Sequence, residues 1–193
     1  MQKFLSKQAS RGTSWVVHYT RAHYCFLIAT LEEHQEFSPL DIFYTTKLMT
    51  NRSYNETLKK IQQSRKDSLV DQISLYLLHS PIGGTNVRKA CKLQRELRSR
   101  ILVHLCPLSS GWEACIEAKK RGWVKSIGVS NFGTKHIQEF EQWGLEKPVL
   151  NQVDLHPFMR RQDIVDVCRK YDIVLEVSPP KSRSPGVRSR LIF

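Results

Sequence analysis

The sequence contains no apolar run long enough to cross a membrane. Its longest one, Tyr24–Leu31, stops at two glutamates, whereas a membrane-spanning helix needs about 18 apolar residues. No small-residue cleavage site follows this run, so we do not predict a signal peptide. Residues 1–30 hold no aspartate or glutamate, which leaves a transit peptide as an open alternative. We expect a cytoplasmic protein with no membrane partner.

The sequence also lacks the cysteine and histidine spacings of disulfide frameworks and metal sites. Its five cysteines are scattered and form no CxxC pair, which favours reduced thiols in a cytosolic protein. Most histidines show no metal-ligand spacing, so we predict no metal. The cysteines are Cys25, Cys91, Cys106, Cys115 and Cys168, and these histidines are His18, His23, His34, His104 and His136.

Acidic residues are scarce in three stretches of the chain. Residues 1–30, 82–110 and 181–193 carry four, six and four Lys/Arg against none, one and none Asp/Glu. Residues 31–81 carry six against seven, and residues 111–180 carry ten of each. A nucleic-acid-binding domain normally builds its basic face into the folded domain. The charge of +12 therefore indicates a composite chain, and we do not predict a nucleic-acid partner.

Five short runs of apolar and β-branched residues end on or near polar side chains. Such runs are typical of buried parallel strands, and helical patterns separate them. This alternation predicts an α/β fold with a parallel sheet. When such a sheet forms a barrel, the carboxyl ends of its strands carry the active site. The predicted strands are Ile42–Lys47, Leu75–His79, Ser126–Val129, Val149–Asp154 and Ile173–Ser178.

Capping signals mark the predicted helices. Ser53 and Glu56 form a capping box before a helix over about residues 54–66. Thr134 is predicted as the N-cap of a helix that Gly144 ends. Two further helices are predicted over Trp112–Lys120 and Asp163–Tyr171.

One interval between strand ends is too long by about one repeat unit. His79 and Ser130 are 51 positions apart, and the excess coincides with the basic residues 82–110. We interpret these residues as a solvated insertion, with a basic amphipathic helix that binds anions or RNA as the alternative. The predicted organisation is an unassigned basic segment 1–38, a barrel domain 39–180 with this insertion, and a disordered basic tail 181–193.

Five motifs in this order give the chain a family resemblance. IFYTTK, LYLLHSP, KSIGVSNF, LNQVDLHP and a degenerate EVSPP resemble the aldo-keto reductases. The resemblance covers residues 39–81 and 111–180. It implies a partial (β/α)8 TIM barrel, with about five of the eight strands recognisable, and the reduction of aldehydes and ketones. It also implies NADPH as the cofactor, with NADH as the alternative, and a small carbonyl compound as the substrate.

The resemblance implies roles for six residues. His79 would hydrogen-bond the substrate carbonyl, and Lys47 would lower the pKa of a catalytic tyrosine, as a nearby cation does. The nicotinamide carboxamide, which has one acceptor and two donors, would be held by Ser130, Asn131 and Gln152. Ser178 would lie near the cofactor pyrophosphate. His156 is interpreted as structural.

The sequence departs from the family pattern at the proton donor and near the C-terminus. The family places its catalytic tyrosine in a D-x-A-x-x-Y stretch before the lysine, and no such stretch is present. Tyr19 lies 28 residues before Lys47, at the family's separation, but its neighbours do not match. Val177 stands where the family stacks a tyrosine on the nicotinamide. The first two strands, the last strand and the residues that grip the adenosine phosphate are not recognisable.

Two interpretations follow from these departures. The first is an aldo-keto reductase-like oxidoreductase, whose lost proton donor would cost on the order of 10²- to 10⁴-fold in rate. The second is a non-catalytic truncated or mis-spliced fragment that acts as a binding protein, with residues 82–110 and 181–193 foreign to the domain. Neither interpretation sets an oligomeric state.

Overall fold

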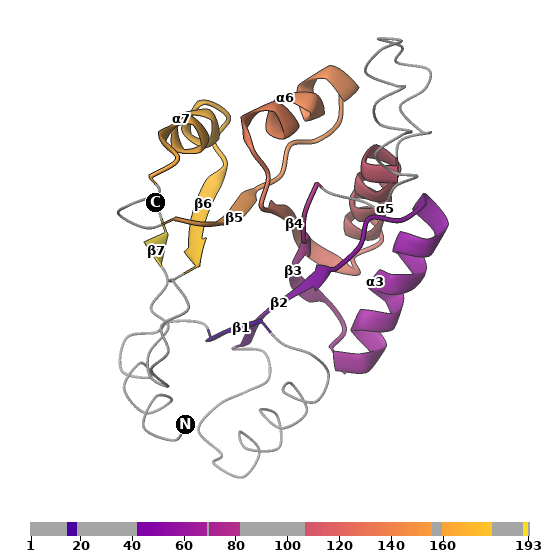
Figure 1. Cartoon of the computed structure of the whole chain (residues 1–193). Coiled ribbons are helices and arrows are strands. Elements are labelled where there is room, and N and C mark those ends of the chain that lie inside the picture. The colour runs from indigo at the N-terminus through magenta and orange to yellow at the C-terminus, as the bar shows by residue number, and fades with distance from the viewer. Residues whose placement is uncertain are drawn as a thin grey trace, which may run out of the picture.

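The computed structural model describes residues 15–18, 42–68, 70–81, 107–155, 160–178 and 191–192. These residues form a seven-stranded sheet whose strands follow the order of the sequence. Strands β1 to β6 are parallel, and β7 is antiparallel to β6. Figure 1 shows α3, α5, α6 and α7 along one side of the curved sheet.

The strands and helices have the following bounds. The strands are β1 (Trp15–His18), β2 (Ile42–Leu48), β3 (Ile73–Leu78), β4 (Val124–Ser130), β5 (Leu150–Asp154), β6 (Val174–Ser178) and β7 (Leu191–Ile192). The helices are α3 (Tyr54–Ser68), α5 (Pro107–Lys120), α6 (Thr134–Trp143) and α7 (Gln162–Lys170). All five predicted strands and all four predicted helices are confirmed, with ends shifted by a few residues.

Two strands escaped the sequence prediction because neither has a periodic pattern of its own. β1 is parallel to β2, with Trp15 opposite Ile42. Leu191 and Ile192 form β7 against β6, so the prediction of disorder is wrong for these two residues. Both strands depend on pairing with a partner that is distant in sequence, and a local pattern does not encode such pairing.

The helix ends differ from the prediction in two places. Helix α5 begins at Pro107, so its first turn includes the last four residues of the predicted insertion. The residues before it, from 82 to 106, lie outside the described part of the chain. Helix α6 has Gly133 as its N-cap, so the prediction of Thr134 as the cap is wrong by one position. The main-chain N–H of Gly133 donates to His136 Nδ1 at 3.3 Å.

The predicted ends of α3 and α6 are otherwise confirmed. Glu56 accepts hydrogen bonds from Ser53 Oγ at 2.8 Å and from the Ser53 amide at 3.4 Å. The bond from the Ser53 amide is one half of the predicted capping box, whereas the bond from the hydroxyl joins the two side chains. Both bonds lower the pKa of Glu56. Gly144 ends α6 with φ of 66°, a left-handed conformation that glycine adopts without strain.

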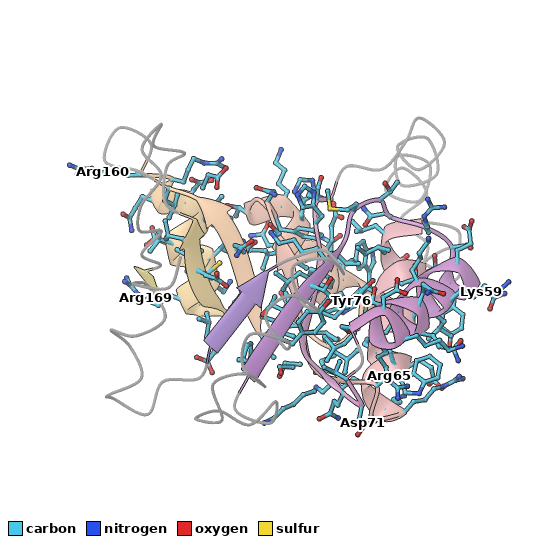
Figure 2. All side chains as sticks on the ribbon, turned by 90° about the horizontal axis from the view of Figure 1, so that it is seen from below. Lys59, Arg65, Asp71, Tyr76, Arg160 and Arg169 are labelled. Atoms are coloured by element: carbon cyan, nitrogen blue, oxygen red, sulfur yellow. The ribbon has the colours of Figure 1, made fainter. Side chains whose placement is uncertain are left out.

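Residues of β2 to β6 pack against the helices. On β4, Ile127 and Val129 are fully buried in the same cluster as Ile137 and Phe140 of α6. Tyr76 of β3 lies between the sheet and α3 in Figure 2, and its burial raises the pKa of its hydroxyl. Burying each such side chain contributes about 1.5–3 kcal/mol. This layer between sheet and helices is the main core of the domain.

The charged ends of side chains point away from this core. In Figure 2, Lys59, Arg160 and Arg169 project outward from the ribbon, and all three are exposed. Within the described residues, no helix is both long and apolar enough to span a membrane.

Gly128 occupies a position of β4 that has no room for a side chain. A Cβ atom there would lie 2.7 Å from the main-chain oxygen of Leu150 and 2.7 Å from Leu77 Cδ2. Contacts this short force the neighbouring backbone to move. Gly128, two residues before Ser130, therefore allows β4 to lie close to Leu77 of β3 and Leu150 of β5.

Candidate active site

Curvature of the sheet brings residues of non-adjacent strands together. Lys47 of β2 donates a hydrogen bond from Nζ to Gln152 Oε1 of β5, although β3 and β4 lie between these strands. In a flat sheet the two strands would be about 14 Å apart, at about 4.8 Å per strand. The contact therefore shows that Lys47 and Gln152 project from the concave face of the sheet.

Strand alternation explains which residues reach this face. On β5, Asn151 and Val153 face the helices, because Asn151 Nδ2 contacts Cys168 Sγ at 3.8 Å and Val153 belongs to the main core. Gln152, between them, faces the opposite way. The concave face therefore carries polar side chains at the carboxyl ends of strands whose other face is apolar.

Lys47 connects β2 to β4 as well as to β5. Its Nζ also donates to Ser130 Oγ at 3.4 Å. The amide nitrogen of His79, just after β3, donates to the main-chain oxygen of Leu48 at 3.0 Å. This bond continues the pairing of β2 and β3 one residue beyond Leu78. Lys47 and His79 are thus held at the same edge of the sheet.

Asn131 connects three strands through three hydrogen bonds. Its Nδ2 donates to the His79 carbonyl oxygen at 3.0 Å and to Ser130 Oγ at 3.1 Å. Its main-chain N–H donates to the Gln152 carbonyl oxygen at 2.8 Å. The residue adopts φ of 61°, a left-handed conformation that asparagine tolerates better than most residues. This turn of the chain directs the side chain back toward β3.

Glu176 is a residue of this site that the sequence analysis missed. It lies opposite Gln152 in the pairing of β5 with β6, and its Oε1 accepts a hydrogen bond from Gln152 Nε2 at 2.8 Å. The side chain is buried, with 4% exposed. The sequence signal that could have identified it is that Glu176 is the one charged residue in the otherwise mostly apolar run Ile173–Ser178. Its partner depends on strand register, which the residues around it do not reveal.

Val177, which stands where the family stacks a tyrosine, is buried near the end of β6. It lies opposite Val153 in the pairing of β5 with β6. Its neighbour Glu176 lies opposite Gln152 and faces the concave side.

His79 has a lowered pKa. Burial of the imidazole is the main cause, and the positive charge of Lys47 is the second. Both disfavour the protonated ring. His79 is therefore neutral at pH 7, with one ring nitrogen as a donor and the other as an acceptor.

Three residues considered in the sequence analysis are not placed in the site. Tyr19 and His156 lie outside the described residues. Ser178 ends β6 opposite Asp154, but its side chain also lies outside what the structure describes. The other five predicted site residues, Lys47, His79, Ser130, Asn131 and Gln152, lie at one edge of the sheet and are linked by hydrogen bonds.

Apart from this cluster, the described residues line a surface pocket, and no group of them forms a metal site. No set of three or more His, Cys, Asp and Glu side chains in this part of the chain has the arrangement of a metal site. A surface pocket of about 400 Å³ lies along α6 and is lined by Lys135, His136, Gln138, Glu139 and Gln142. It contains none of the residues at the ends of β2 to β6.

Curated proteins similar to this chain include aldo-keto reductases. The chain is 36% identical over 138 residues to human Aldo-keto reductase family 1 member C1, covering 70% of this chain and 42% of that protein. It is 34% identical to Prostaglandin F synthase 1 of Bos taurus over the same shares. An uncharacterized oxidoreductase of Saccharomyces cerevisiae is 35% identical, covering 72% of this chain and 44% of that protein. The chain thus spans less than half the length of these relatives.

Solved structures agree with the sequence comparisons. An aldo/keto reductase from Brucella melitensis superposes with a TM-score of 0.62 and 32% identity, covering 81% of this chain and 53% of that chain. A Bombyx mori aldo-keto reductase in complex with NADP has a TM-score of 0.62 at 22% identity, which supports the fold alone. Residues 27–180 match the sequence model of the Aldo/keto reductase family. This chain belongs to the aldo/keto reductase family.

Proposed function

We propose that this chain binds NADPH at the carboxyl ends of β2 to β6 and reduces aldehydes or ketones, with a small carbonyl compound as its substrate. The observation that carries the proposal is the hydrogen-bonded convergence of Lys47, Ser130, Asn131 and Gln152 from separate strands. Active sites of parallel barrels lie at this edge. The family assignment supports the same function.

The polar side chains present fit a nicotinamide carboxamide. That group has one acceptor oxygen and an NH₂ with two donors. Asn131 and Gln152 each offer an amide nitrogen and an amide oxygen, and Ser130 offers a hydroxyl that donates and accepts. A hydrogen bond joins the side chains of Asn131 and Ser130, and the side chain of Gln152 is held by Lys47 and Glu176. When bound, NADPH supplies the hydride for carbonyl reduction.

Lys47 and His79 would act on the substrate oxygen. Negative charge develops on a carbonyl oxygen as it is reduced, and a fixed ammonium group nearby stabilises it. The neutral imidazole of His79 can donate one N–H to the same oxygen without carrying a charge. Lys47 is held in place by Ser130 and Gln152, so it need not be reoriented during the reaction.

A catalytic role also requires a proton donor, and the motif that supplies it in the family is not present in this sequence. The sequence has no D-x-A-x-x-Y stretch, and Tyr19 is the candidate replacement by its separation from Lys47. Tyr19→Phe tests this replacement: a loss of carbonyl reduction on the order of 10²-fold or more would assign the proton donor to Tyr19. This absence favours, as the second candidate function, a protein that binds the cofactor without reducing carbonyl compounds.

We also propose a domain organisation and a cellular location for this chain. We place the reductase domain at residues 39–180, interrupted by the basic segment 82–110, with the unassigned basic segment 1–38 before it and the basic tail 181–193 after it. NADPH is the proposed cofactor, and NADH is the alternative. The reduced cysteines predicted from the sequence favour a cytoplasmic location.

A fluorescence titration of the purified chain with NADPH tests the proposal. We expect micromolar binding by the original chain and at least about tenfold weaker binding by Asn131→Ala, because Asn131 loses hydrogen bonds of about 1–1.5 kcal/mol each. Asn55→Ala is the matched control, since Asn55 is exposed on α3. Absence of saturable binding up to millimolar NADPH, by a chain with native circular dichroism, would overturn the proposal.

A further inference from the structure

The site contains two side chains of opposite charge at the two ends of one amide. Lys47 donates to the amide oxygen of Gln152, and Glu176 accepts from its amide nitrogen at 2.8 Å. The oxygen is the negative end of the amide dipole and the nitrogen is the positive end. Both contacts therefore favour the same orientation of the Gln152 side chain.

This arrangement spans the concave face of the sheet. Lys47 comes from β2, Gln152 from β5 and Glu176 from β6. Gln152 and Glu176 are buried, with 4% exposed each. Charges in a buried setting interact more strongly than charges in water. A ligand held by Gln152 would therefore lie close to both the ammonium group and the carboxylate.

We propose that Glu176 and Lys47 act in opposite directions to set which oxidation state of the nicotinamide cofactor this site prefers. The inference rests on the proposed function, because it requires the carboxamide to bind beside Gln152. The nicotinamide ring carries one positive charge in NADP⁺ and none in NADPH, whereas the phosphates are the same in both. The Glu176 carboxylate favours the oxidised ring, and the Lys47 ammonium disfavours it.

Two other titratable groups in the described part of the chain, Asp154 and His79, have smaller effects on this preference. Asp154 lies at the end of β5 but is exposed, so water and salt screen its charge. His79 has a lowered pKa and carries no charge at pH 7. Among these groups, Lys47 and Glu176 are the ones whose charges Gln152 links directly.

The test measures the dissociation constants of NADP⁺ and NADPH at pH 7 and low salt. We expect Glu176→Gln to raise the ratio of Kd for NADP⁺ to Kd for NADPH about tenfold, since it removes one nearby charge. Lys47→Met should lower the same ratio by a similar factor. The double variant should return close to the original ratio. Because both ligands report on the same folded molecules, partial unfolding of a variant cancels from the ratio.

The control is Glu117→Gln, which changes a carboxylate of α5 that pairs with Arg121 at the surface. This variant should leave the ratio unchanged. If both cofactors bind but neither site variant moves the ratio by more than twofold, the inference is overturned while the proposed function stands. Shifts in the same direction also overturn it. If the folded original chain binds neither cofactor, the proposed function fails and this inference fails with it.

Discussion

The two faces of β4, β5 and β6 carry different kinds of residue. On the helix-facing side, Val129, Val153 and Leu175 lie in one apolar core. On the concave side, Ser130, Gln152 and Glu176 are equally buried but polar. The first face gains stability from removing apolar area from water. The second must satisfy every polar group it buries, and it does so by linking strands through side chains.

This contrast explains where the family motifs lie. In IGVSNF, Ile127 and Val129 face the helices and Ser130 faces the concave side. In NQVD, Val153 faces the helices and Gln152 faces the concave side, so each motif contributes to both faces. We expect changes on the helix-facing side to alter the free energy of unfolding and leave cofactor affinity unchanged. Changes on the concave side should do the reverse. The predictions below test that separation, from the largest expected effect to the smallest.

Trp112→Ala should cause the largest loss of stability. Trp112 of α5 is fully buried, its Nε1 donates to the Glu146 carbonyl oxygen at 2.7 Å, and its ring lies 5.0 Å from that of Phe140. Removing it should lower the free energy of unfolding by about 3–5 kcal/mol, as measured by urea denaturation. The folded fraction should bind NADPH as before, and a weaker intrinsic affinity would contradict the separation of the two faces.

Gly128→Ala should lower both the free energy of unfolding and the affinity for NADPH. The new Cβ would collide with the Leu150 carbonyl oxygen, two residues before Gln152, so we expect a loss of about 1–3 kcal/mol in stability and weaker NADPH binding. Gly122→Ala is the control, because Gly122 has φ of 72° and open space around it. That variant should lower the free energy of unfolding by about 1–2 kcal/mol and leave the affinity for NADPH unchanged. Equal affinities for the two variants would show that β4 adapts without moving the site.

Ser130→Ala should affect binding more than stability. It removes the hydroxyl that accepts from Lys47 and Asn131, so the Kd for NADPH should rise about five- to tenfold, as expected for one hydrogen bond of about 1–1.5 kcal/mol. The free energy of unfolding should change by no more than about 1 kcal/mol. Ser126→Ala, on the same face at the opposite end of β4, is the control. A larger stability loss than for Gly128→Ala would place Ser130 with the structural residues.

The pH dependence of stability should show a small contribution from His79. Its pKa in the folded chain lies below the ordinary value of 6.5, so below that pH the unfolded chain binds the proton more readily. Stability should therefore fall as the pH is lowered from 6.5 through the folded pKa. His79→Gln should lack this part of the acid sensitivity when unfolding is compared at pH 7 and pH 5.5.

A related variant separates the two causes of the shift. Lys47→Met removes the nearby positive charge, so the pKa of His79 in an NMR titration should rise toward its ordinary value. It should not reach that value, because burial of the ring is the larger cause. An unchanged pKa would mean that Lys47 is not close to the imidazole in solution.

Much of the fold was predictable because its signals are local. Apolar runs, the bond of Glu56 to the Ser53 amide and the Gly144 helix end all depend on residues close in sequence, and the structure confirms each of them. The five predicted site residues that the structure describes were found through motifs in which their neighbours are also characteristic. The exact cap of α6 was missed, because Gly133 and Thr134 are both acceptable N-caps.

The sequence alone determined which residues are polar at the ends of which strands, because alternation and motif spacing are properties of the chain itself. Only the tertiary structure decided that Lys47 of β2 meets Gln152 of β5, since this contact depends on the curvature of the whole sheet. It also decided that Glu176 lies opposite Gln152 and contacts it, through the register of β5 with β6. Register and curvature arise from packing between distant segments, and no local stretch of sequence specifies them.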